Sequence, residues 1–141
     1  MNSLYLEIQE QILAYWHDVD RNWGRTAHEF YTPDGRYTTS QKSRQGQEAI
    51  RAFYSKREDR GERVARHLVN NLHLISQSQT HVEAIWVLLI YASDGVPVLP
   101  ASVPNLIADV TDEFVRDEQG SWRLAERKII PLFKGSIPTT G

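Results

Sequence analysis

The stretch HVEAIWVLLIYAS at residues 81–93 is rich in Val, Ile, Leu and aromatic side chains. Its apolar part is far too short to cross a membrane, and its composition favours an extended strand. Three more stretches share this composition, at residues 66–75, 106–116 and 122–133. Because turn or loop residues separate all four, the second half of the chain predicts four long antiparallel strands.

The connections between these strands differ in length. Residues 117–120, Asp-Glu-Gln-Gly, are typical of a hairpin turn. Residues 94–105 contain one glycine and three prolines. We expect this longer segment to be a loop that covers the mouth of a pocket.

The first half of the chain has helical periodicity. Apolar residues recur at helical spacing from Ser3 to about Trp23, which predicts an amphipathic helix interrupted at Gly24. A second, short helix is predicted through Ala27, Phe30 and Tyr31, then a short strand at 36–39 and a helix at 47–60. Helices followed by strands indicate an α+β fold, with the helices on one face of an antiparallel sheet.

Composition narrows the classes of function. The 141 residues suit one domain, placed at residues 1–141, and the absence of cysteine excludes disulfides and thiol chemistry. A formal charge of −2 gives no reason to expect nucleic acid as a partner. The amino-terminal residues do not resemble a secretory signal, so we expect a cytoplasmic protein that does not contact a membrane.

Asp20 is the most informative candidate for chemistry. Ile8, Ile12, Trp16 and Asp20 are each four residues apart, so the carboxylate continues the stripe that should face the core. A buried carboxylate needs a hydrogen-bonding or cationic partner, or a solvated cavity. The alternative is that the helix frays by residue 20, leaving Asp20 in solvent or capping the segment that begins at Trp23.

His67 presents a conflict within residues 66–75. Strand alternation puts His67 on one face with Val69, Asn71, His73 and Ile75. The other face is more apolar, with Leu68, Leu72 and Leu74. Simple alternation would therefore expose His67. Two arrangements would bury it: a sheet covered on both faces, by helices and by a second subunit, or a β-bulge at Asn70-Asn71.

Aromatic side chains are numerous enough to line an apolar ligand cavity, although core packing also explains most of them. They are Tyr15, Trp16, Trp23, Tyr31, Tyr37, Tyr54, Trp86 and Tyr91. His17 and Asp20 lack a third ligand, so we predict no metal site. The sequence contains neither a phosphate-binding loop nor a nucleophile elbow, and we predict no cofactor.

Five segments in order resemble the SnoaL-like branch of the nuclear-transport-factor-two-like superfamily. They are ILAYWHDVDRNW, FYTPDGRYTT, GQEAIRAFY, RHLVNNLHL and DEFVRDEQGSWRLAERKI. The resemblance runs from about Leu4 to about Leu132 and is to scytalone dehydratase and hexachlorocyclohexane dehydrochlorinase relatives. It implies a cone-shaped, cystatin-like α+β roll, in which amino-terminal helices pack on a strongly curved antiparallel sheet and enclose a pocket.

The resemblance also implies roles for individual residues. In these enzymes the first helix supplies an aspartate and the first long strand a histidine, which form the catalytic pair, and Asp20 and His67 fall on those positions. Tyr15 matches a tyrosine that is frequent in the family, and Asn71 matches a polar strand position. With the cavity-lining aromatics Trp16, Tyr31, Tyr37, Tyr54 and Trp86, they are the predicted substrate-binding residues. The pocket arginine of the dehydrochlorinase has two counterparts, Arg116 or Arg127. The second pocket histidine of scytalone dehydratases has no clear counterpart.

The function predicted from the sequence is a cofactor-independent, dehydratase-like lyase or isomerase acting on a small, hydrophobic, cyclic substrate. His67 would be the base, and Asp20 would fix its tautomer. Two other classes remain open: a non-catalytic small-ligand-binding protein, and the small structural subunit of a ring-hydroxylating dioxygenase. We expect a homodimer or homotrimer, because the helices of one chain cover only one face of the sheet.

Overall fold

The computed structural model describes residues 3–40 and 42–136. Its helices are α1 (Ser3–Arg21), the 3₁₀ helix η1 (Ala27–Phe30) and α2 (Gln47–Glu58). Its strands are β1 (Tyr31–Thr39), β2 (Lys42–Gln45), β3 (Arg63–Gln77), β4 (His81–Asp94), β5 (Leu106–Arg116) and β6 (Trp122–Lys134). The predicted α+β class is confirmed. No helix in this part of the chain is long and apolar enough to span a membrane.

The strands of the described residues form one sheet in the order β2-β1-β6-β5-β4-β3. Neighbouring strands are antiparallel except β1 and β6, which are parallel. The sheet is therefore mixed, where the sequence predicts a purely antiparallel one, because β1 and β6 are joined by no hairpin. β1 also begins at Tyr31, which the sequence places in a helix.

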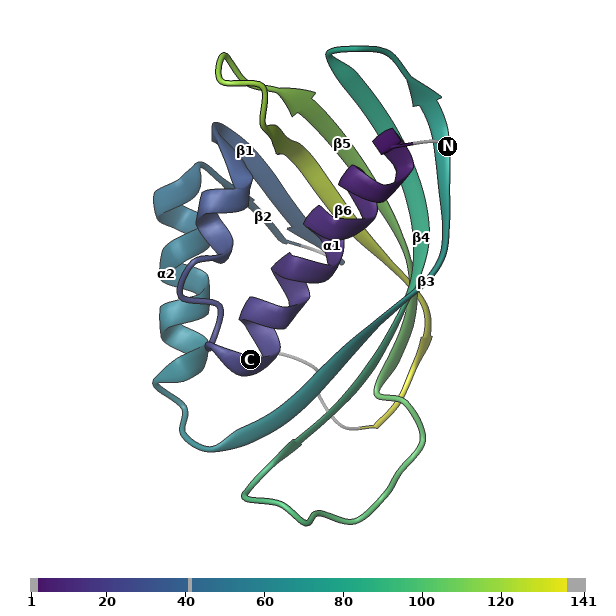
Figure 1. Ribbon diagram of the computed structural model, residues 1–141. Helices are drawn as coiled ribbons and strands as arrows, with labels where there is room; N and C mark the ends of the chain where they lie inside the picture. The colour runs from purple at the N-terminus through teal and green to yellow at the C-terminus, as the bar shows by residue number, and fades with distance from the viewer. Residues whose placement is uncertain (1–2, 41, 137–141) are drawn as a thin grey trace.

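The sheet curls strongly, and α1 and α2 both lie on its concave side (Figure 1). The core fills the space between them. From α1 it receives the buried side chains of Ile8, Ile12, Tyr15, Trp16 and Val19, and from β4 those of Val82, Ala84, Trp86, Leu88, Ile90 and Ala92. The curved roll implied by the resemblance is confirmed, with a sheet that does not close on itself.

A bulge in β3 resolves the conflict at His67. The register with β4 shifts between Asn70 and His73, and Asn71 has a left-handed φ of 57°. His67, before the bulge, faces the helices, and after the bulge Leu72 and Leu74 pack against the core. Leu68, which simple alternation would bury, is 41% exposed. The bulge is thus the arrangement that brings His67 inside.

The turn after α1 packs closely against α2. Trp23 and Gly24 have left-handed φ values of 59° and 70°. A Cβ atom at Gly24 would lie 2.6 Å from Cδ1 of Tyr54, so only glycine fits there. Asp18 holds the same turn, because its carboxylate accepts hydrogen bonds from the Thr26 backbone and hydroxyl.

Candidate active site

Asp20 and His67 are hydrogen-bonded to each other between α1 and β3. His67 Nδ1 lies 2.6 Å from Asp20 Oδ1, and the His67 backbone N–H donates to Asp20 Oδ2 over 2.8 Å. The side chains of His67 and Asp20 are only 3% and 7% exposed. Both carboxylate oxygens therefore orient the histidine, one through its ring and one through its backbone.

Trp16 packs against the face of the same imidazole. The two ring centroids are 4.3 Å apart and the ring planes are inclined by 10°. Trp16 precedes Asp20 by one helical turn, so α1 supplies both the hydrogen bond and the stacking surface. Within residues 3–40 and 42–136, His67 Nε2 has no hydrogen-bond partner. This nitrogen is the one that can exchange a proton with a ligand.

The environment of His67 favours the neutral imidazole. Burial lowers the pKa of His67 below its ordinary value, because removal of water penalises the charged form. The hydrogen bond and charge of Asp20 raise this pKa, whereas the positive charges of Arg57 and Arg63 lower it further. The net effect is a lowered pKa, which leaves His67 able to accept a proton at neutral pH.

Tyr15 is the centre of a buried cluster of phenol groups. Its Oη lies 2.9 Å from Tyr31 Oη and 2.7 Å from Tyr54 Oη. Tyr37 stacks on Tyr54 with a centroid separation of 6.2 Å. Burial raises the pKa of Tyr15, Tyr31 and Tyr54 well above the usual value. The hydroxyl groups therefore stay protonated and can donate hydrogen bonds.

A fully buried ion pair lies against this cluster. Arg127 Nε and Nη2 donate to Asp112 over 2.7 and 2.8 Å, and Trp86 Nε1 donates to the same carboxylate over 2.8 Å. Burial lowers the pKa of Arg127, but the charge and hydrogen bonds of Asp112 outweigh it and raise this pKa above its usual value. The guanidinium lies 4.5 Å from the ring centroid of Tyr15 and 5.3 Å from that of Trp16.

Two buried donors beside the ion pair lack a hydrogen-bond partner in the described part of the chain. They are Arg127 Nη1 and Trp16 Nε1. Both side chains lie near His67, because Trp16 stacks on His67 and Arg127 packs on Trp16. An unpaired buried donor is costly, so each of these two atoms favours contact with a hydrogen-bond acceptor.

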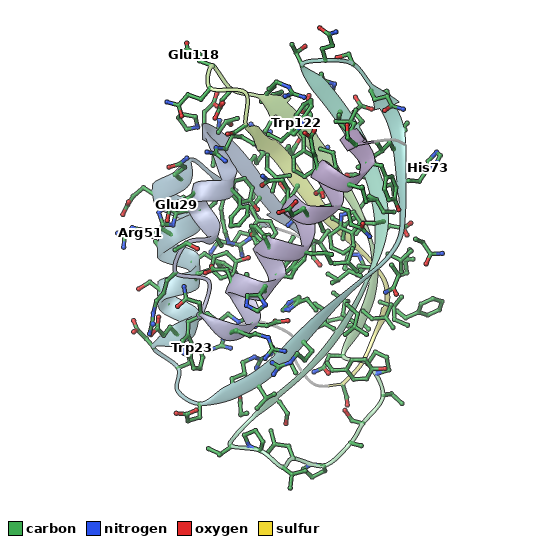
Figure 2. All side chains as sticks on the ribbon, viewed as in Figure 1. Trp23, Glu29, Arg51, His73, Glu118 and Trp122 are labelled. Carbon is green, nitrogen blue, oxygen red and sulfur yellow. The ribbon has the colours of Figure 1, made fainter. Side chains whose placement is uncertain are left out.

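The structure brings together most of the predicted substrate-binding residues. Tyr15, Trp16, Tyr31, Tyr37, Tyr54 and Trp86 are all buried on the concave side of the sheet. Asn71 is instead exposed at the bulge. Of the two candidate arginines, Arg127 is inside, whereas Arg116 is exposed and packs on the ring of Trp122. His73 points away from the helices (Figure 2).

The residues predicted from the sequence do not include three charged residues near the site, Asp112, Arg57 and Arg63. The sequence does carry a signal for Asp112, which continues the inward face of β5 after Leu106, Ala108 and Val110. Arg57 and Arg63 are buried without such a signal, because they belong to a segment in which nearly every residue is charged.

Comparison with known proteins places the chain in a family. The SnoaL-like domain profile matches residues 3–128, so the chain belongs to the SnoaL-like family. The predicted resemblance is thereby confirmed. No curated protein sequence matches the chain.

Several solved structures share the fold. One is a Catenulispora acidiphila protein in complex with S-DNPA, with 22% identity, a TM-score of 0.76, and 92% of this chain and 95% of that chain covered. A Nostoc punctiforme protein with a cystatin-like fold has 19% identity, a TM-score of 0.77, and coverage of 98% and 96%. A candidate scytalone dehydratase from Novosphingobium aromaticivorans has 14% identity, a TM-score of 0.79, and coverage of 98% and 91%.

Proposed function

We propose that the protein is a cofactor-independent enzyme of the dehydratase or isomerase type, in which His67 removes a proton from carbon. The observation that carries the proposal is the bonding of His67, with Nδ1 held by Asp20 and Nε2 left without a partner. The family and its neighbours support a small-molecule function, since one neighbour binds S-DNPA and another is a candidate scytalone dehydratase. We propose a small, largely hydrophobic, cyclic substrate.

In the proposed reaction, His67 Nε2 accepts a proton from a substrate carbon next to a carbonyl group. The electron pair of the C–H bond forms a carbon–carbon double bond, and the bond from the β carbon to a hydroxyl oxygen breaks. The departing oxygen takes up the proton that His67 held and leaves as water. Asp20 stabilises the intermediate imidazolium and keeps the tautomer with the proton on Nδ1.

Negative charge develops on the substrate carbonyl oxygen during this step. We assign its stabilisation to Trp16 Nε1 and Arg127 Nη1, the two buried donors without a partner. Such donors act strongly where water is excluded, because they are already oriented before the reaction begins. In this assignment Asp112 is a positioning residue, because it holds the guanidinium of Arg127 through two of its nitrogens.

Deuterium exchange tests proton removal whatever group leaves in the later step. We would incubate the protein with cyclic β-hydroxy ketones in D₂O and follow the proton next to the carbonyl by NMR. We expect enzyme-dependent exchange or elimination that is lost in His67→Ala. His73→Ala is the matched control, because His73 is an exposed histidine of the same strand. Equal exchange in wild type and His67→Ala would show that His67 is not the base.

One observation favours the alternative of a structural subunit. The predicted binding aromatics are at most 3% exposed and pack on one another, as expected for a protein whose interior is filled with side chains. A purely structural subunit would catalyse no exchange with any ketone and would co-purify from its source with a large iron-containing protein. These two results together would replace the enzymatic proposal.

A further inference from the structure

A small cavity lies beside Asp20 at the carboxyl end of α1. Its volume is about 30 Å³, and it is lined by Val19, Asp20, Trp23, Arg57, Arg63 and Ala65. Figure 2 shows Trp23 at this end of the molecule. One water-sized group needs roughly 10–15 Å³, so the cavity has room for about two such groups.

Arg57 lines this cavity without a counter-ion. The residue is 8% exposed, yet no hydrogen bond or ion pair of its guanidinium is found within the part of the chain that the structure describes. The carboxyl end of a helix favours cations, which accounts for the exposed neighbour Lys56. The helix end supplies no partner for the guanidinium of Arg57, whose nitrogens keep contact with solvent through the cavity and the adjoining hollow. A bound anion can therefore reach and pair with this cation.

A second arginine lies in the wall of the same cavity as Arg57. Arg63 is the second cation in the cavity wall, and its side chain is only 7% exposed. Burial and the charge of Arg57 lower the pKa of Arg63, even though Asp94 lies 3.2 Å from its Nη1. The carboxylate in the wall, Asp20, uses both oxygens to hold His67.

Arg57 also borders a more open hollow of about 150 Å³. Phe53, Lys56 and Arg60 line that hollow together with Arg57. Three of its four lining residues are cationic, so the approach to Arg57 attracts anions electrostatically.

We infer that the cavity between Arg57 and Arg63 binds the carboxylate group of an organic acid, and that the substrate is therefore a small cyclic acid. The fork of a guanidinium matches the two oxygens of a carboxylate, and the cavity has room for two such atoms. The inference rests on the proposed function only in naming the acid as substrate, because binding can be measured without turnover.

Benzoate and its neutral analogue benzamide are suitable probes. We would titrate each into the ¹⁵N-labelled full chain and follow the Trp23 indole N–H and the backbone of Arg63 and Ala65 by NMR. We expect saturable shifts at these residues with benzoate and none with benzamide. Bound benzoate should also raise the pKa of His67, because it offsets the charges of Arg57 and Arg63, the cations that oppose Asp20 there.

Substitutions at one position test the role of the charge. Arg57→Gln should weaken benzoate binding about tenfold to a hundredfold, since it removes charge-assisted hydrogen bonds, and Arg57→Lys should have a smaller effect. Arg36→Gln is the matched control, because Arg36 is an exposed arginine of β1, which three other strands separate from β3 in the sheet. We expect a change of less than about twofold for it, as for a surface charge remote from the site. If Arg57→Gln does not fold, the affinity of Arg57→Lys for benzoate and the difference between benzoate and benzamide test the carboxylate site instead.

Several results would overturn the inference. These are equal binding of benzamide, no benzoate-induced shift at millimolar concentration, or an equal loss in Arg36→Gln. The proposed function has a separate outcome. If neutral ketones exchange deuterium but benzoate does not bind, only the carboxylate site is wrong. If benzoate binds but no ketone or keto acid reacts, the site stands and the enzymatic proposal does not.

Discussion

Trp16 and His67 stack face to face, with ring centroids 4.3 Å apart. The indole excludes water from one side of the imidazole and so contributes to the burial that lowers the pKa of His67. We expect Trp16→Ala to hydrate the imidazole and raise its pKa towards the ordinary value of about 6.5. An NMR titration of the ring protons measures this change. Trp122→Ala removes another buried tryptophan and should leave the pKa unchanged.

The lowered pKa of His67 determines how activity depends on pH. The neutral base is the active form, so we expect turnover to rise with pH through one ionisation below about 6.5 and to level off above it. Asp20→Asn should move this ionisation to still lower pH, because it removes the charge that favours imidazolium. A profile that falls with rising pH across this range would contradict the assignment of His67 as base.

The lowered pKa of His67 also makes the free energy of unfolding depend on pH. Unfolded His67 takes up a proton near pH 6.5, before the folded protein does, because its folded pKa is lower. The contribution of His67 to the free energy of unfolding is therefore largest above pH 6.5 and decreases as the pH falls through the folded pKa. Urea unfolding between pH 7.5 and pH 5 should show this loss in wild type and a smaller one in His67→Gln.

Asp20 and His67 should behave as one unit in catalysis. We expect His67→Ala and Asp20→Asn each to lower turnover by roughly 10²–10⁴-fold, as for the loss of general base catalysis. The double variant should be little worse than the worse single variant. Steady-state rates with a ketone found by deuterium exchange provide the measurement. Strictly additive losses would show that the two residues act independently.

The buried pair of Asp112 and Arg127 should matter greatly for stability. Asp112→Ala leaves a buried guanidinium without its counter-ion, which costs about 3–5 kcal/mol of unfolding free energy. Urea denaturation measures the loss. Replacing both residues by leucine and methionine should recover much of it, and Glu118→Gln in the exposed hairpin should change stability by less than about 0.5 kcal/mol.

The convex face of the sheet should form the contact between subunits. No helix of the described residues covers it, and Leu68, Ile75 and Tyr91 there are 41%, 55% and 39% exposed. We expect a homodimer or homotrimer by light scattering, and dissociation when Leu68 and Tyr91 are both replaced by glutamate. A wild-type monomer at micromolar concentration would contradict this expectation.

Sequence periodicity accounts for much of the fold. The helix containing Asp20 and the four long strands follow from apolar spacing, because burial of one face governs which residue types occur there. Strand β2 escapes this reasoning, because Lys42–Gln45 contains no apolar residue and is held by backbone pairing with β1. Its partner β1 pairs in parallel with β6, whose paired residues lie 90 or more positions later, as with Arg36 and Glu126. Local pattern does not encode such a pairing.

The site is less evident in the sequence than the fold. The periodicity around Asp20 reveals a buried carboxylate, but the partner of that carboxylate lies 47 residues away and is indicated by family resemblance alone. The sequence pattern does not show that Arg57 is buried, because an arginine in a charged segment fits the same pattern whether it is exposed or buried. Only three-dimensional placement distinguishes the two.

The bulge at Asn71 reverses the inward phase of β3 between the residues before it and those from Leu72 to Leu74. Upstream, odd-numbered positions such as His67 face the helices, and downstream, even-numbered positions such as Leu72 do. Removing one residue at the bulge would give the residues on its two sides the same phase and turn either His67 or Leu72 and Leu74 outward. A frame-preserving deletion there would therefore be more damaging than most substitutions. Because the bulge separates the two segments, substitutions around His67 can change the site while Leu72 and Leu74 stay packed against the core.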